Sequence, residues 1–69
     1  MVDTNKLRGA IAENGMSQRQ VAGMLGITEK TFYLKMKKGI FDSNEMSAMI
    51  KILEIKHPAD IFFAEFVAQ

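Results

Sequence analysis

The 69 residues suffice for one small domain, and the absence of cysteine excludes disulfides and thiolate zinc sites as sources of stability. The composition, 48% hydrophobic and 25% charged, is ordinary for a globular domain, and the start MVDTNKLR does not resemble a secretory signal. The most apolar segment, 61–68, is too short to span a bilayer, so we expect a cytoplasmic protein without a membrane partner.

The net charge of +1 conceals an asymmetry between the two parts of the chain. Residues 1–39 hold seven Lys and Arg against three acids, which gives +4, whereas residues 40–69 hold two against five, which gives −3. This distribution favours one surface that faces a polyanion, such as a nucleic acid. Chance clustering on solvated helix faces is the alternative explanation.

One pattern that is typical of helix starts occurs three times. A capping residue, whose side chain accepts hydrogen bonds from free amides of the first turn, lies between two apolar residues that can pack together as a hydrophobic staple. Two of the caps are also followed by a capping-box partner, Gln20 and Glu45. The three caps and their apolar neighbours are Met16-Ser17 with Val21, Ile27-Thr28 with Phe32, and Phe41-Asp42 with Met46.

Glycines mark the ends of the helical runs. Gly15, Gly26 and Gly39 each follow such a run, and glycine readily adopts the left-handed conformation that commonly ends a helix. Together with the starts, they predict four helices over residues 4–14, 18–25, 29–38 and 43–53. The apolar spacing predicts a buried stripe on each helix, made of Leu7, Ile11, Val21, Ala22, Leu25, Phe32, Met36, Met46, Met49, Ile50 and Leu53.

Two further glycines, Gly9 and Gly23, lie inside predicted helices, where each costs about 1 kcal/mol relative to alanine. A close helix crossing would explain Gly9, and nothing in the sequence explains Gly23. Lys35 is expected to lay its methylene stem along the core and to leave its ammonium group in water.

The C-terminal stretch permits more than one structure. Pro58 suits the first turn of a short fifth helix, but the segment IFFAEFVAQ after Asp60 fits helix and extended strand equally well. Its phenylalanines, Phe62, Phe63 and Phe66, either complete the core of the monomer or form an apolar patch for a second subunit. The predicted fold is therefore an all-α domain of four to five helices over residues 1–69, with an apolar tail whose conformation stays open.

The second and third predicted helices form the unit that points to function. Only Gly26, Ile27 and Thr28 separate them, and two short helices joined by such a glycine-containing turn make a helix-turn-helix, here about 17–38. Ala22 is small enough for the two helices to cross closely.

Helical geometry places Glu29, Lys30, Tyr33, Leu34 and Lys37 within an arc of about 140°, opposite the core-facing residues of the same helix. Lysines beside an exposed aromatic and an exposed leucine suit a DNA major groove, with its phosphates, base edges and thymine methyl groups. Glu29 either accepts from a cytosine amino group or stabilises the helix N-terminus.

Phosphate contacts are expected at the edges of this unit. Gln18 and Arg19 open the second helix, where free amides favour anions, and Thr28 caps the third. Lys38 either holds a phosphate or complements the helix dipole. The full set of expected DNA contacts is Gln18, Arg19, Thr28, Glu29, Lys30, Tyr33, Leu34, Lys37, Lys38, Ser43 and Asn44.

The stretch MSQRQVAGMLGITEKTFYLKMKKG resembles the helix-turn-helix of Cro/repressor-type phage regulators. KLRGAIAENG before it, FDSNEMSAMIKILEI after it, and the terminal IFF with its VAQ tail resemble a subgroup of short phage-encoded members, so the resemblance covers nearly the whole chain. Two features depart from the common pattern: Lys35 replaces an apolar core residue, although this subgroup often has lysine there, and Lys37-Lys38 replaces an Asn-Gly turn.

The resemblance implies a transcriptional regulator that binds double-stranded operator DNA as a dimer, with Gln18 and Thr28 holding phosphates and Glu29, Lys30, Tyr33 and Leu34 facing base edges. We expect a homodimer formed through the C-terminal apolar residues, and no small-molecule ligand or cofactor.

An enzyme is not expected, because the one histidine, His57, has no cysteine or second histidine beside it, and no phosphate loop, nucleophile motif or metal spacing occurs. The rival hypothesis is a protein-interaction module that uses the same fold without specific DNA binding.

Overall fold

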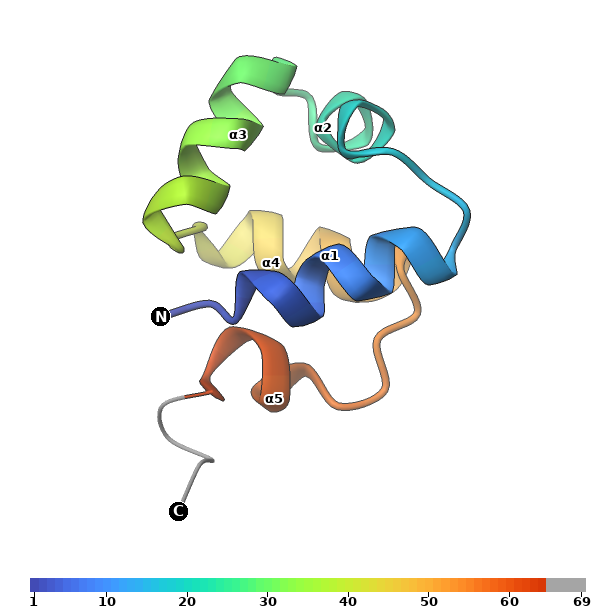
Figure 1. Cartoon of the computed structure of the whole chain (residues 1–69), viewed down its shortest axis with the longest axis vertical. Helices are drawn as coiled ribbons and strands as arrows, with labels where there is room; N and C mark the ends of the chain where they lie inside the picture. Colours follow the sequence, from blue (N-terminus) through green and yellow to red (C-terminus); the bar gives the residue numbers. More distant parts are fainter. Residues whose placement is uncertain (65–69) are drawn as a thin grey trace.

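The structure, a computed structural model, describes residues 1–64. Within that range it contains five helices and no strand, which confirms the predicted all-α class. α2 and α3 lie at one end of the molecule, α5 lies at the other, and α1 and α4 lie between them (Figure 1). None of the described helices has the length and apolar character needed to cross a bilayer. The helices are α1 (Thr4–Glu13), α2 (Gln18–Leu25), α3 (Glu29–Lys38), α4 (Ser43–Ile52) and α5 (Pro58–Phe62).

The three predicted helix starts are confirmed. The Ser17 hydroxyl accepts from the Gln20 amide at 3.1 Å, and Gln20 Oε1 accepts from the Ser17 amide at 2.8 Å, which completes a capping box. Asp42 and Glu45 form the second box, and Thr28 caps α3 by accepting from the amide of Thr31. Each of these three helices therefore begins where a short side chain accepts from an amide that the helix itself leaves unpaired.

Two of the predicted helix ends have the expected left-handed caps, Gly26 with φ 76° and Gly39 with φ 70°. The C-cap of α1 is instead Asn14, and Gly15 follows it with φ 66°. The C-cap of α4 is Leu53, and Glu54 after it takes the left-handed conformation with φ 49°, at a position where the sequence has no glycine. Predicted and observed bounds of these four helices differ by at most one residue.

The core lies where the inner faces of the five helices meet. Phe32, Leu7 and Met49 are the largest of its fully buried side chains, and the Phe32 ring packs on Phe41 with the centroids 5.5 Å apart. Leu25, Met46 and Ile50, predicted as buried, lie partly buried against this core. The core residues are Val2, Leu7, Ile11, Val21, Ala22, Phe32, Met36, Phe41, Met49, Leu53, Ile61 and Phe62.

Hydrogen bonds between distant parts of the chain close the domain. The Val2 amide donates to the Gly39 carbonyl at 3.0 Å, and the Asp3 amide donates to the Ile61 carbonyl at 2.7 Å. The Asn14 side-chain amide donates to the Leu53 carbonyl at 3.0 Å. The segment before α1 thus joins the end of α3 to α5, and Asn14 joins the ends of α1 and α4.

Of the C-terminal phenylalanines, one completes the core and its neighbour is exposed. Phe62 is 2% exposed and belongs to the core, whereas Phe63 is 48% exposed. Phe66 and the rest of 65–69 lie outside the described residues, so the question of helix or extended tail stays a prediction there.

The expectation of a close helix crossing at Gly9 is wrong. Gly9 is exposed, and a Cβ built on it would meet no neighbouring atom within 4 Å. Gly23 is also exposed with open space around it, so the structure offers no packing reason for either glycine.

Replacing Gly9 by alanine is therefore expected to stabilise the protein by about 0.5–1 kcal/mol, because alanine loses less backbone freedom on folding and meets no obstacle. Urea denaturation followed by circular dichroism measures the change. Gly26→Ala is the matched control: its left-handed φ of 76° should make the same substitution destabilising. A destabilised Gly9→Ala variant would contradict this account.

Candidate nucleic-acid interface

α3 forms an outer edge of the molecule and runs from the end of α2 to the start of α4 (Figure 1). The predicted division of this helix into two faces is confirmed. Phe32 and Met36 are buried at 0% and 3% exposure, whereas Tyr33 and Leu34 are 58% and 44% exposed. The exposed arc, which we define as Glu29, Lys30, Tyr33, Leu34 and Lys37, thus offers two apolar side chains between charged ones.

At the start of α3, the Thr28 hydroxyl is already engaged. It accepts from the Thr31 amide at 3.1 Å and donates to the Thr31 hydroxyl at 2.9 Å. The amides of Glu29 and Lys30 have no partner among the described residues. An anion at this end of α3 would therefore meet main-chain donors, and Thr28 would have to turn its hydroxyl hydrogen away from Thr31 to contribute.

The start of α2 carries the next two expected contacts. Gln18 is half-buried and Arg19 is exposed, and both follow the Ser17 cap. The described hydrogen bonds do not join these two side chains to α3 or α4. Among residues 1–64, the amides of Gln18 and Arg19 at this second helix N-terminus and the Arg19 guanidinium beside it have no partner.

At the end of α3, three lysines have different surroundings. Lys37 and Lys38 are exposed, as expected for side chains that could hold phosphate. Lys35, in contrast, places its Nζ 2.6 Å from Glu45 Oε2. The expectation that its ammonium lies in water is wrong, because this cation is paired with a carboxylate on α4.

Glu45 makes two interactions, of which the sequence predicts only one. Its exposure is 8%, and it is the one buried charged side chain of residues 1–64. The capping box predicted the bond of its Oε1 to the Asp42 amide, observed at 2.9 Å. The second oxygen, Oε2, accepts from Lys35, ten residues earlier in the chain. No local sequence motif predicts an ion pair between two helices that are separated by a turn.

Ser43 and Asn44 open α4 and are exposed. Residues 39–42 connect them to the end of α3, so they lie close to that end of the exposed arc (Figure 1). The structure therefore brings together the contacts expected on α3 and at the start of α4.

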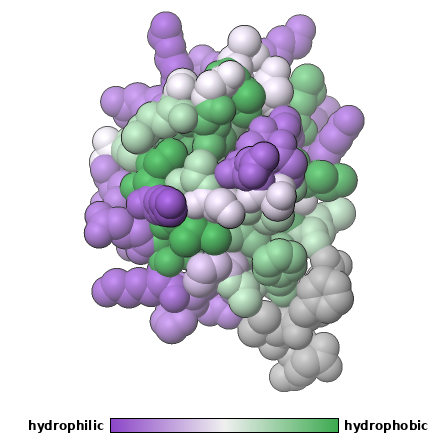
Figure 2. All heavy atoms as spheres, turned by 180° about the vertical axis from the view of Figure 1, so that it is seen from behind, coloured by the Kyte–Doolittle hydropathy of each residue, from purple (hydrophilic) through white to green (hydrophobic). Residues whose placement is uncertain are grey.

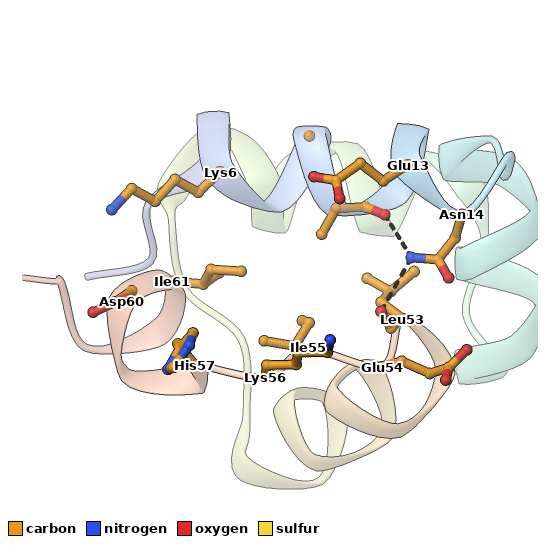
Figure 3. A pocket seen from close by; sticks show the side chains of 12 residues that line it. Lys6, Glu13, Asn14, Leu53, Glu54, Ile55, Lys56, His57, Asp60 and Ile61 are labelled. Atoms are coloured by element: carbon orange, nitrogen blue, oxygen red, sulfur yellow. Dashed lines mark hydrogen bonds between the residues drawn. The ribbon is translucent and has the colours of Figure 1, made fainter.

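Two hollows lie away from the exposed arc. The larger, about 570 Å³, is an open groove between α1, the end of α4 and α5, with Lys6, Glu13, Lys56 and Asp60 among its lining residues (Figure 3). Its lining contains both basic and acidic side chains, and none of the residues expected to contact DNA lies in it.

The smaller hollow, about 200 Å³, is apolar. Met1, Ile40 and Phe63 line it and are 69%, 62% and 48% exposed, and we call these three residues the apolar patch. Hydrophobic atoms reach the surface toward the lower right of the view in Figure 2, and hydrophilic side chains project from the end that holds α2 and α3 as well as from the lower left. The patch adjoins Gly39, the residue that caps α3.

Comparisons of the chain with protein-family models, with curated proteins and with solved structures find no match.

Proposed function

We propose that this protein binds double-stranded DNA sequence-specifically, as a small transcriptional regulator of the Cro/repressor type. α2, the turn Gly26–Thr28 and α3 act as the helix-turn-helix, and α3 enters the major groove. The resemblance of residues 16–39 to such regulators favours this function over other uses of a small helical domain.

The exposed arc of α3 is the observation that carries the proposal. A helix that merely faces solvent has no reason to expose Tyr33 and Leu34 side by side in the middle of its outer face. In a major groove these two side chains meet base edges and thymine methyl groups, and Lys30 and Lys37 on either side meet phosphates. The same arc thus supplies both the contacts that position a protein on DNA and those that read its sequence.

The free amides at the starts of α2 and α3 support the proposal, since helix N-termini attract phosphate groups. The charge distribution agrees with it, because residues 1–39, which contain both helices, hold the excess of positive charge.

Selection of bound sequences from random duplex DNA tests the proposal. We expect enrichment of one motif, and binding to the selected duplex should be tighter than to a shuffled one by about a thousandfold or more. Both affinities should fall as salt is added, because bound phosphates release counterions. Failure to bind any duplex at low salt would refute the proposal.

We further propose that the DNA-binding form is a homodimer, held through the apolar patch and the C-terminal apolar residues. Three large apolar side chains are exposed together there, and one of them, Phe63, belongs to the C-terminal apolar segment of the sequence. Because the patch adjoins the cap of α3, a two-fold axis through it would bring the two recognition helices near each other.

Sedimentation equilibrium tests the dimer. Phe63→Ser and Phe66→Ser are expected to raise the dimer dissociation constant at least about tenfold, because burying a phenylalanine side chain contributes about 1.5–3 kcal/mol. Met24→Ser is the matched control, since Met24 is 58% exposed on α2, at the other end of the molecule. A wild-type protein that stays monomeric at high concentration would contradict the dimer.

A protein-interaction module remains the second candidate, favoured by the exposure of Met24 in addition to Tyr33 and Leu34. A methionine and an aromatic on neighbouring helices suit a protein surface as well as a groove. The salt dependence described above separates the two functions, because an apolar protein interface does not weaken steeply with salt.

A further inference from the structure

We propose that Lys35 and Glu45 are positioning residues: their ion pair sets the direction of the recognition helix α3 relative to the start of α4, and thereby the protein's discrimination between DNA sequences. The inference rests on the proposed function and adds to it two residues that do not themselves face the exposed arc.

Both carboxylate oxygens of Glu45 accept hydrogen bonds, each from a different partner. Its Oε2 accepts from Lys35 Nζ at 2.6 Å, and its Oε1 accepts from the Asp42 amide at 2.9 Å. The Asp42 carboxylate in turn accepts from the Glu45 amide at 2.7 Å. Because the Glu45 side chain is 9% exposed, water competes little for these bonds, and its orientation is fixed from both ends.

The ion pair bridges residues 39–42, which connect α3 to the start of α4, and both of these elements carry expected DNA contacts. The Lys35 carbonyl accepts from the amides of Gly39 at 2.8 Å and Ile40 at 3.2 Å, so this residue also takes part in the C-terminal cap of α3. The Lys35 side chain extends from α3 to Glu45 in the first turn of α4. Asp42 is the N-cap of α4. Among the described residues, the bond between Lys35 and Glu45 is the one side-chain hydrogen bond between α3 and α4, and α3 otherwise packs mainly on α2.

The pairing also changes what Lys35 contributes to binding. With a carboxylate oxygen at 2.6 Å, its charge is compensated within the protein and is not available to replace counterions on DNA. Lys37, two residues later on the same helix turn, is exposed, and no carboxylate of the described part of the chain pairs with it. Two lysines of one turn are therefore expected to affect binding in different ways, and this makes them matched probes.

The test compares Lys35→Met with Lys37→Met, each measured at a temperature at which circular dichroism shows the variant folded. The two probes are a duplex selected from random DNA with the wild-type protein and a shuffled duplex of equal length. Lys35→Met should lower the affinity for the selected duplex about tenfold or more, the loss typical of one mismatched base pair, and leave the shuffled duplex within about twofold. Its plot of log affinity against log salt should keep the wild-type slope.

Lys37→Met should instead weaken binding to both duplexes similarly and reduce the slope by about 1. Lys35→Arg, which can keep the ion pair, should restore discrimination. If Lys35→Met unfolds because Glu45 is left buried and unpaired, the double variant Lys35→Met/Glu45→Gln removes that charge and should show the same loss of discrimination.

Unchanged discrimination in the folded Lys35→Met or in the double variant would overturn the inference, and so would a slope reduced as in Lys37→Met. These outcomes differ from failure of the proposed function, in which the wild type binds no duplex or Lys37→Met leaves the slope unaltered.

Discussion

The double variant Lys30→Ala/Lys37→Ala is expected to bind duplex DNA with a salt dependence shallower by about 1.8, because each lysine that neutralises a phosphate contributes about 0.9 to the slope. Both lysines lie on the exposed arc and are exposed. Affinity at low salt should fall for every duplex sequence, since phosphate contacts carry no sequence information. Fluorescence anisotropy titrations over a series of salt concentrations measure both quantities.

The matched control is Lys51→Ala/Lys56→Ala. It removes the same two charges from exposed lysines of the other half of the chain, so net charge falls equally in both variants, from +1 to −1. We expect this control to keep nearly the wild-type slope. Equal reductions in the two double variants would mean that overall charge, and not the exposed arc, determines binding.

Replacing Phe32 by alanine should remove a large share of the protein's free energy of unfolding. Phe32 has no exposed surface and packs on Phe41, and truncation of a buried phenylalanine typically costs about 3–5 kcal/mol. At 0.05–0.15 kcal/mol per residue, a chain of this length is stable by only about 3–10 kcal/mol. Thermal unfolding followed by far-ultraviolet circular dichroism should therefore show a transition that is strongly lowered or absent.

For the neighbouring Tyr33, we expect the same substitution to affect DNA binding and to leave stability almost unchanged. Tyr33 is 58% exposed, so Tyr33→Ala is expected to change stability by no more than about 0.5 kcal/mol. It should nevertheless lower affinity for the selected duplex about tenfold, in the range of one base contact. Strong destabilisation by Tyr33→Ala, or wild-type stability of Phe32→Ala, would contradict the assignment of Phe32 to the buried face and Tyr33 to the exposed face of α3.

The parts of the fold that the sequence predicts well are those determined within one turn of helix. The caps Ser17, Thr28 and Asp42 bond to amides three residues later, and glycine at 26 and 39 allows a left-handed end. Such features depend on neighbours in the chain, so their signature is a short spacing. The division of α3 into a buried and an exposed face follows in the same way from helical periodicity.

Two interactions that the sequence does not predict depend on distant partners. Lys35 pairs with Glu45 across the turn between two helices, and Asn14 donates to the Leu53 carbonyl 39 residues away. A lysine in an otherwise core-facing position was expected to extend into water because its partner is not visible in any local pattern. Gly9 shows the converse, since a helix-interior glycine suggests a crowded neighbour and the structure has open space.

The start of the chain is part of the support of α3, through the hydrogen bond from Val2 to Gly39. The side chain of Met1 also lies against Gly39: a Cβ placed there would come within 2.9 Å of Met1 Cγ. An affinity tag joined before Met1, or loss of Met1, would therefore alter the surroundings of the α3 cap and one wall of the apolar patch. Recombinant protein with an extended N-terminus should be compared with untagged protein before its DNA affinity or its oligomeric state is interpreted.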